Sequence, residues 1–259
     1  MVKRILLVLV ACFALAAPAS AATKPTVVLV HGAFADASGW NDVILKLQKR
    51  GYPVVAPPNP LRGVSADAAY LKSYLTAVKG PIVLVGHSYG GMVITNAATG
   101  NPNVKALVYV AAYAPDEGDT VAGLSALAKG GMVGPETLDI TPFPNPDGTV
   151  GQEGAIKLSV FRKIFCADVS PKLADAMARA QRPASLVALG EPSGVPAWKT
   201  IPSYYLVAGK DLTIGTAAEK IMAKRIGAKK TVVLPSSSHV AMISHAAETT
   251  ALVVEAAKG

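Results

Sequence analysis

Short, nearly all-apolar runs alternate along this chain with longer segments of helical spacing. The apolar runs in the first half occupy residues 26–31, 53–56, 82–86 and 106–111. Strands that are covered on both faces form such continuous apolar runs, because no face of the sheet meets water. The segment after the first run repeats apolar side chains at i, i+3, i+4 and i+7, which is one face of a helix: Trp40, Val43, Ile44 and Leu47. This order predicts an α/β fold with a mostly parallel central sheet and helices on both faces.

The alternation is interrupted between about residues 116 and 199. This stretch is rich in Gly and Pro, as in the segment TPFPNPDG at residues 141–148. Helical spacing is present in it only near residues 156–165 and 171–180. The strand and helix rhythm then resumes, with strands at 203–208 and 231–234, a helix near 217–226 and a last helix from Ser244. We therefore expect residues 23–259 to form one domain that carries an inserted cap at about 116–199.

The first 22 residues have the pattern of an export signal. Lys3 and Arg4 precede an apolar run at residues 5–17, and small residues then offer an A-x-A cleavage site after Ala21. The run is too short for a membrane span of about 20 residues. We expect an exported protein, periplasmic or secreted, without stable membrane insertion once the signal is removed. A lipid anchor at Cys12 is the alternative, because residues 9–12 (LVAC) resemble a lipobox.

Composition argues against several classes of function. The formal charge is +8, and without Lys3 and Arg4 there are 23 basic against 17 acidic residues. These charges are dispersed, whereas a nucleic-acid-binding protein usually has a basic stripe with interleaved aromatics. The four histidines and Cys166 lack the spacing of a zinc site, so we expect no metal and no cofactor. Cys166 has no partner for a disulfide outside the signal, and we expect a buried, inert thiol.

The motif Gly86-His87-Ser88-Tyr89-Gly90 lies between an apolar run and a helical segment. This is the context of a nucleophile elbow, in which a serine occupies a sharp strand-to-helix turn that exposes its hydroxyl above the sheet. Gly86 and Gly90 keep side chains out of the place where the strand and the helix converge. The sequence therefore predicts Ser88 as a nucleophile.

A serine hydroxyl needs a base within hydrogen-bond reach, and the base needs an acid. His239 follows the strand at 231–234, so we expect it at the carboxyl edge of the sheet as the base. Asp211 follows the strand at 203–208 and gives the chain order Ser, Asp, His of this type of elbow. Asp116, after the strand at 106–111, is the rival for the acid. We expect His31 to shape its loop, His87 to point into the scaffold and His245 to begin a helix.

Acyl transfer also needs hydrogen-bond donors for the oxyanion that develops on the carbonyl oxygen. In an elbow one donor is the backbone N–H of the residue after the nucleophile, here Tyr89. The other is expected from the loop that follows the first strand, and we assign it to the N–H of Ala33. Gly32 lets this loop come close to the substrate.

Together these segments resemble the α/β hydrolases. More narrowly, the segment VLVHGA at residues 28–33, the elbow at 86–91, Gly209-Lys210-Asp211 and SHVAM at 238–242 are similar to the plant methylesterase and hydroxynitrile lyase group and its bacterial esterase relatives. The resemblance covers nearly the whole chain after the signal and is weak between residues 122 and 153. It implies the same triad and the same two oxyanion donors. The lyases carry Thr where this chain has Gly32 and Lys where it has Val240, so the resemblance implies an esterase rather than a lyase.

Three functions are compatible with these residues. The first is a secreted carboxylic-ester hydrolase that acts through an acyl-enzyme on a small, partly apolar substrate. The second is a lactonase or cofactor-free perhydrolase with the same triad, and the third is a small-molecule sensor that retains a hydrolase pocket. Apolar side chains of the cap and loops are candidates for the substrate pocket: Phe34, Phe161, Phe165, Trp198, Met242 and, with them, Met132.

Overall fold

The structure is a computed structural model, and it describes residues 24–145 and 147–259. The predictions of an export signal at residues 1–22 and of a lipid anchor at Cys12 lie outside the described residues. No helix in the described ranges is long and apolar enough to cross a membrane.

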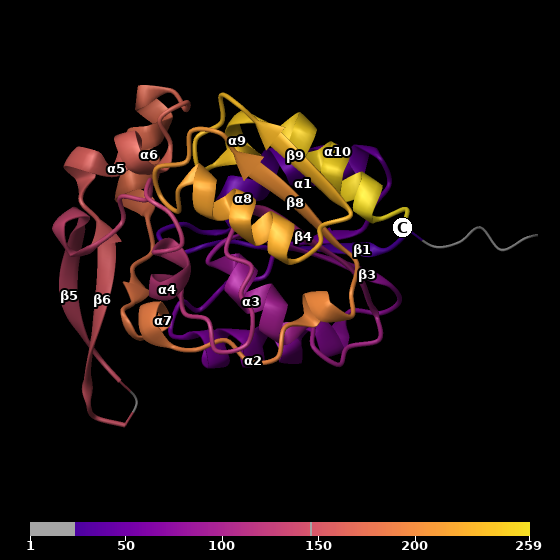
Figure 1. Cartoon of the computed structure of the whole chain (residues 1–259), viewed down its shortest axis with the longest axis horizontal. Helices are drawn as coiled ribbons and strands as arrows, with labels where there is room; N and C mark the ends of the chain where they lie inside the picture. Colours follow the sequence, from indigo (N-terminus) through magenta and orange to yellow (C-terminus); the bar gives the residue numbers. More distant parts are fainter. Residues whose placement is uncertain (1–23, 146) are drawn as a thin grey trace, which may run out of the picture.

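A six-stranded, fully parallel sheet forms the centre of the molecule (Figure 1). Its strand order is β2-β1-β3-β4-β8-β9. The strands are β1 (Thr26–Val30), β2 (Val54–Val55), β3 (Ile82–Ser88), β4 (Val104–Ala112), β8 (Ser203–Ala208) and β9 (Lys230–Leu234). The six apolar runs of the sequence correspond to these six strands, so the predicted α/β class is confirmed.

Helices cover both faces of this sheet. On one face, α1 (Asn41–Lys49) packs on α10 (Ala246–Ala256), and α10 also contacts β3, β4 and β8. On the other face, α2 (Val64–Ala77) packs on α3 (Gly90–Ala97), which lies against β3 and β4, while α8 (Thr216–Arg225) packs on β8. The four inner strands β1, β3, β4 and β8 are almost fully buried, whereas the edge strand β2 is half-buried and the edge strand β9 is mostly exposed. The inner strands form one continuous apolar core with the inner faces of these helices.

The strand order reverses between β1 and β3. From β1 the chain leads through α1 to the edge strand β2, whereas from β3 it leads through α3 to β4 on the other side. The loops after β1 and β3 therefore diverge, and a crevice opens at the carboxyl ends of these two strands. Ligands of open α/β sheets bind at such a switch point. It lies between the loop that contains Ala33 and the elbow that contains Ser88.

The elbow glycines are required by close approach. A Cβ on Gly90 would lie 2.6 Å from the carbonyl oxygen of Val30, and a Cβ on Gly91 would lie 2.0 Å from that of Tyr113. A side chain at either position would push α3 away from the sheet. The glycines thus allow α3 to begin directly behind the turn that contains Ser88.

The segment between β4 and β8 differs from the expectation in one respect. It contains the two expected helices, α5 (Leu158–Phe165) and α6 (Pro171–Ala180), together with the short helices α4 (Val121–Ser125) and α7 (Val187–Gly190). It also contains a second, antiparallel sheet that the sequence did not predict, built from β5 (Leu138–Pro144), β6 (Val150–Ile156) and β7 (Ala184–Ser185). The β5–β6 hairpin projects from the body of the molecule (Figure 1).

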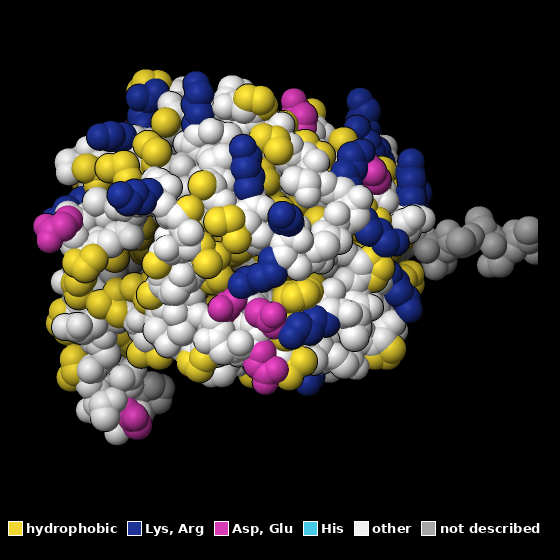
Figure 2. Space-filling model, in the orientation of Figure 1, with side chains coloured by type: hydrophobic (Ala, Val, Ile, Leu, Met, Phe, Trp, Pro, Cys, Tyr) yellow, Lys and Arg dark blue, Asp and Glu magenta, His cyan; other side chains and the backbone are white. Residues whose placement is uncertain are grey.

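Charged side chains are dispersed over the surface. On the face in Figure 2, Lys and Arg side chains lie over several elements rather than in one stripe.

Candidate active site

His239 and Asp211 meet at the carboxyl edge of the sheet. His239 lies in the loop between β9 and α9 (Ala241–Ser244), and Asp211 lies in the loop after β8. The distance between His239 Nδ1 and Asp211 Oδ2 is 2.6 Å, and both side chains are fully buried. This contact fixes the ring orientation and places the N–H on Nδ1, which leaves Nε2 as the basic nitrogen.

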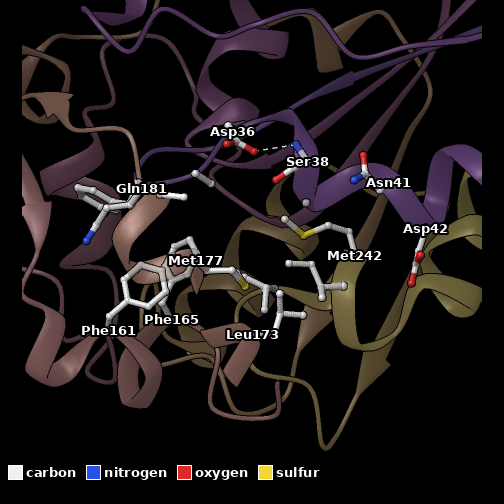
Figure 3. Close-up of a pocket in the computed structure, with 16 residues that line it drawn as sticks. Asp36, Ser38, Asn41, Asp42, Phe161, Phe165, Leu173, Met177, Gln181 and Met242 are labelled. Carbon is white, nitrogen blue, oxygen red and sulfur yellow. Dashed lines mark hydrogen bonds between the residues drawn. The ribbon is translucent and has the colours of Figure 1, made fainter. Parts of the chain in front are cut away.

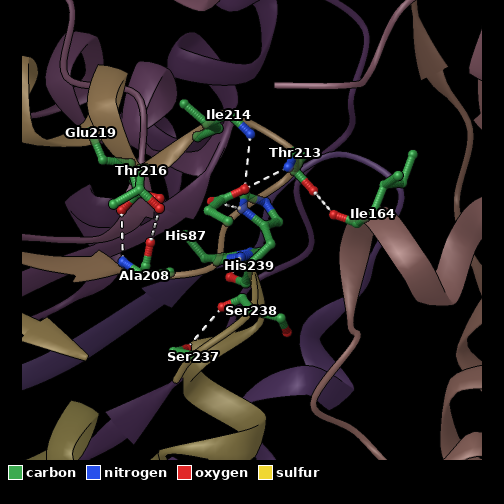
Figure 4. A network of polar contacts seen from close by, with 12 residues as sticks. His87, Ile164, Ala208, Thr213, Ile214, Thr216, Glu219, Ser237, Ser238 and His239 are labelled. Carbon is green, nitrogen blue, oxygen red and sulfur yellow. Dashed lines mark hydrogen bonds and ion pairs between the residues drawn. The ribbon is translucent and has the colours of Figure 1, made fainter. Parts of the chain in front are cut away.

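The loop after β8 stabilises the Asp211 carboxylate. Asp211 Oδ1 accepts hydrogen bonds from the backbone N–H groups of Thr213 at 2.5 Å and Ile214 at 2.9 Å (Figure 4). Burial by itself would raise the pKa of Asp211, but the neighbouring His239 and these donors outweigh burial and hold the pKa below its usual range. Asp211 is therefore ionised beside the imidazole at neutral pH.

Ser88 ends β3 in a strained conformation. Its φ is 53°, a left-handed value that a non-glycine residue rarely adopts. Ser88 and Thr213 line the same small cavity, so the serine and the loop of Asp211 meet there. The Nε2 atom of His239 is buried without a hydrogen-bond partner in the described part of the chain. A hydrogen bond from a nucleophilic serine to a histidine base is often long, or not yet formed, before substrate binds.

Two backbone N–H groups lie beside Ser88. Ala33 and Tyr89 line the same small cavity, and neither N–H donates to an acceptor within residues 24–145 and 147–259. The ring of Tyr89 is held from behind, because its hydroxyl donates to the buried Asp67 carboxylate at 2.8 Å. A Cβ on Gly32 would lie 2.6 Å from Ser88 Cβ, so glycine is needed for this loop to approach the serine so closely.

His31 and His87 have separate structural roles. His31 Nδ1 lies 2.9 Å from the carbonyl oxygen of Gly32, and its Nε2 accepts the N–H of Asn59 at 2.9 Å, so it shapes the loop after β1 as expected. His87 points into the scaffold, and the part of the scaffold that it contacts is the loop that carries His239. His87 Nε2 donates to the carbonyl oxygen of His239 at 3.0 Å, and the two ring centroids are 4.6 Å apart.

The rival acid lies elsewhere. Asp116 forms an ion pair with Lys199 at 2.6 Å and remains partly exposed. The side chain of His245 is also partly exposed and lies near Asp168 and Glu248. Asp211, and not Asp116, is therefore the carboxylate that contacts His239.

Two cavities adjoin this group of residues. The smaller, of about 40 Å³, is lined by Ser88, Ala33, Tyr89 and apolar side chains of the segment between β4 and β8. The larger, of about 290 Å³, lies between α5, α6 and the loop after β1. Figure 3 shows Phe161, Phe165 and Met177 on one side of it and Met242 on another. Phe34 lines both cavities, and its φ of 61° is also left-handed.

The chain matches the alpha/beta hydrolase family over residues 27–252. It belongs to this family. The resemblance that the motifs carry is thereby confirmed at the level of the family.

Relatives of this α/β hydrolase include bacterial and plant proteins. It is 36% identical to a carbendazim-hydrolysing esterase of a Nocardioides species over 110 residues, which are 38% of this chain and 46% of that enzyme. It is 26% identical to a pyrethroid hydrolase of Sphingobium wenxiniae over 84% of this chain and 82% of the relative. A methylesterase from Arabidopsis has the same fold, with a TM-score of 0.73, 19% identity and coverage of 90% of this chain and 99% of that structure.

Two pocket predictions require correction. Trp198 lines neither cavity of this α/β hydrolase. Its indole N–H donates to the carbonyl oxygen of Pro115 at 2.6 Å, and this acceptor holds the ring away from the site. Met132 is exposed on the surface and lines neither cavity. Phe34, Phe161, Phe165 and Met242 all line the larger cavity.

The sequence did not single out two acidic residues that support the site. Asp168, between α5 and α6, accepts hydrogen bonds from the backbone N–H of Ser238 at 2.9 Å and from the hydroxyl of the same serine. Glu219, in the first turn of α8, is fully buried and accepts the N–H of Ala208 at 3.0 Å. In the sequence both resemble ordinary solvated acids, and only the packing distinguishes them.

Proposed function

We propose that this protein is an exported serine esterase that cleaves a carboxylic ester through an acyl-enzyme, with Ser88 as nucleophile, His239 as base and Asp211 as acid. The buried contact between His239 Nδ1 and Asp211 Oδ2, beside a strained serine at the switch point of the sheet, carries the proposal. The bacterial relatives that hydrolyse carbendazim and pyrethroids support the same class of reaction.

In the first half of the reaction, Ser88 Oγ attacks the ester carbonyl carbon while His239 Nε2 takes the hydroxyl proton. The carbonyl oxygen becomes an oxyanion, and the N–H groups of Ala33 and Tyr89 donate to it. Each such donor contributes about 2.7–4 kcal/mol to the transition state. The bond to the alcohol oxygen then breaks, and His239 returns the proton to that oxygen, so that the alcohol leaves and the acyl group stays on Ser88.

In the second half of the reaction, water hydrolyses the acyl-enzyme. His239 takes a proton from water, the hydroxide attacks the acyl carbon, and the acid leaves as Ser88 recovers its proton. Asp211 remains ionised throughout and stabilises the imidazolium.

The cavities support an ester with one bulky apolar part. The larger cavity is lined mainly by aromatic and aliphatic side chains, and its volume of about 290 Å³ is at the lower end of the range for small-molecule sites. The smaller cavity at Ser88, of about 40 Å³, accommodates only a compact group. We propose that a compact acyl or alkyl group lies there and that the bulky part lies against Phe161 and Phe165.

The test is turnover of p-nitrophenyl esters together with labelling by a fluorophosphonate. Ser88→Ala is expected to lose at least about 10⁴-fold in kcat and to lose the label, while its circular dichroism is unchanged. Ser73→Ala, an exposed serine on α2, is the matched control and should keep both. A folded Ser88→Ala protein with near-normal turnover would refute the assignment. The same assay with peroxide tests for perhydrolase activity.

Export is tested separately by fractionating a Gram-negative host. The full-length chain is expected in the periplasm with Ala22 as its first residue, because the cleavage site follows Ala21. A chain without residues 1–22 should stay in the cytoplasm. A membrane-bound product that begins at Cys12 would instead indicate a lipoprotein.

A further inference from the structure

A second carboxyl group lies behind the triad. Glu219 is fully buried in the first turn of α8, and its Oε2 accepts the N–H of Ala208 at 3.0 Å (Figure 4). Its Oε1 is buried and receives no hydrogen bond from an N–H or hydroxyl group in the part of the chain that the structure describes. Asp211 bonds to the same residue: its backbone N–H donates to the carbonyl oxygen of Ala208 at 3.4 Å, so Ala208 holds Glu219 and Asp211 side by side. The pKa values of the two carboxyl groups depend on each other accordingly.

Two adjacent buried carboxyl groups do not both ionise, because neither water nor a shared cation screens their repulsion. The donors decide which of them keeps the proton. Asp211 accepts hydrogen bonds from the backbone N–H groups of Thr213 and Ile214 and from the ring N–H of His239. Among the residues that the structure describes, Glu219 accepts only the backbone N–H of Ala208. The charge therefore stays on Asp211 and the proton stays on Glu219.

We propose that Glu219 is a neutral carboxylic acid that donates a hydrogen bond from Oε1 to the Asp211 carboxylate, and that it thereby positions and tunes the acid of the triad. The proposal rests on the function assigned above, since it needs Asp211 to act through His239. Glu219 does not touch the reacting atoms and is a positioning residue.

The other ionisable groups around the pair agree with this charge state. Burial, followed by the charge of Asp211, raises the pKa of Glu219 well above its usual value. Tyr205 on β8 and Tyr113 after β4 also face the pair. Burial raises the pKa of Tyr113 to about 12 and raises the pKa of Tyr205 well above its usual value. Both tyrosines are thus neutral. His239, with His87 behind it, faces Asp211 from the other side.

The variants Glu219→Gln and Glu219→Met distinguish a protonated Glu219 from an ionised one. Glu219→Gln keeps a neutral donor toward Asp211 and an acceptor for Ala208, so its kcat/KM and the acid limb of its pH profile should match the wild type. Glu219→Met removes the donor. The charge of Asp211 then acts more strongly on the His239 imidazolium, so the acid limb should move to higher pH and kcat/KM should fall about 10-fold.

An ionised Glu219 would give the opposite result. Both variants would then remove a negative charge, and both acid limbs would move to lower pH. If both variants lose activity and neither limb moves, the role of Glu219 is only structural. Either result would overturn the proposal.

Thermal stability gives a second readout that needs no turnover. The pKa of Glu219 is higher in the folded than in the unfolded state, so the folded wild type binds a proton that the unfolded chain releases. The free energy of unfolding of the wild type therefore falls as pH rises from the unfolded-state pKa to the folded-state pKa. Glu219→Gln carries no such proton. Its Tm advantage over the wild type should therefore grow from about pH 5 to about pH 8.

The matched control is Glu117→Gln, which changes an exposed carboxylate on a loop and should show a Tm difference that does not vary with pH. A flat or shrinking difference for Glu219→Gln would overturn the proposal even if activity is retained. Ser88→Ala tests the esterase assignment by turnover, whereas the Tm experiment tests whether Glu219 is protonated in the folded state. A failure of the esterase proposal can therefore be distinguished from a failure of the Glu219 proposal.

Discussion

At the residue scale, the site depends on which carboxyl group carries its charge next to His239. Asp211 is ionised although it is fully buried, because two backbone N–H groups and the imidazole surround it. Asp116 is ionised for a simpler reason, since it is partly exposed beside Lys199. Burial alone therefore does not determine the charge of an acid in this fold, and the local donors do.

Asp211→Asn is expected to lower kcat by about 10²- to 10⁴-fold, because an amide can present its N–H to the imidazole and stabilise the wrong tautomer. The measurement is kcat on a p-nitrophenyl ester, with circular dichroism to show that the fold is kept. Asp116→Asn is the control and should stay near the wild-type rate. If Asp116→Asn is the more damaging change, the assignment of the acid is wrong.

Phe34 determines how the two cavities are divided. It lines both of them, and its backbone adopts a left-handed φ of 61°. Phe34→Ala should join the cavities, because the ring is the side chain that they share. The ratio of kcat/KM for p-nitrophenyl octanoate to that for the acetate is therefore expected to rise several-fold.

The control for this prediction is Phe143→Ala, which removes an aromatic ring from the β5–β6 hairpin outside both of these cavities. Its selectivity should not change. Equal losses on the short and the long ester for Phe34→Ala would mean that the ring only supports the oxyanion loop.

At the element scale, the loop that carries His239 is held by the linker between α5 and α6. The N–H and the hydroxyl of Ser238 both donate to Asp168. Burial raises the pKa of Asp168, but the hydrogen bonds that the carboxylate accepts, first among them the two from Ser238, outweigh burial and lower it. Because the pKa of Asp168 is lower in the folded state, its ionised carboxylate stabilises the fold at pH values above the unfolded-state pKa. This stabilisation is lost as the pH falls through the folded-state pKa.

Asp168→Asn should accordingly lower Tm at pH 7, and the difference from the wild type should close below about pH 4. Activity should fall as well, because the loop of His239 loses its anchor. Asp175→Asn changes an exposed acid on α6 that pairs with Arg179, and it is the control for surface charge. A Tm difference that persists unchanged at low pH would contradict the role of the carboxylate.

The β5–β6 hairpin could not be predicted from apolar patterns in the sequence. β5 contains Pro142 and Pro144, and nearly all of its side chains are exposed or half-buried, so it has neither an apolar run nor alternation. Proline is tolerated there because β5 is the edge strand of the small sheet and pairs only with β6. The inner parallel strands could be predicted because burial on both faces requires apolar residues, and β5 lacks this signal because it is mostly exposed and interrupted by proline.

The same contrast applies to the site. The proposed triad could be selected from the sequence because the elbow motif and the positions of strand ends restrict the choice to Ser88, His239 and Asp211. Glu219 could not, since its significance depends on α8 packing against β8 and burying a carboxyl group that would be solvated on an isolated helix. Trp198 was misassigned for a related reason, because the acceptor for its indole N–H is 83 positions away in the sequence.

At the scale of the whole molecule, the segment between β4 and β8 is joined to the central sheet at several separate points. The hydroxyl of Thr213 donates to the carbonyl oxygen of Ile164 at 2.7 Å, and the N–H of Ser185 donates to that of Leu61 at 2.9 Å. Arg62 also pairs with Glu153 at 2.7 Å. The segment shares one apolar core with the sheet, so we expect both to unfold together.

Cys166 provides the measurement for this expectation. It lies at the end of α5, is fully buried, and burial raises the pKa of its thiol to about 12, so the native state should react very slowly with thiol reagents. If the molecule is one cooperative unit, the free energy of opening from alkylation rates should equal that of global unfolding, with the same dependence on urea. Leu45→Cys, at an exposed position on α1, supplies a thiol whose rate should not depend on urea. A much weaker urea dependence for Cys166 would show that the segment opens alone, and the larger cavity would then be formed by two parts that separate while the sheet stays folded.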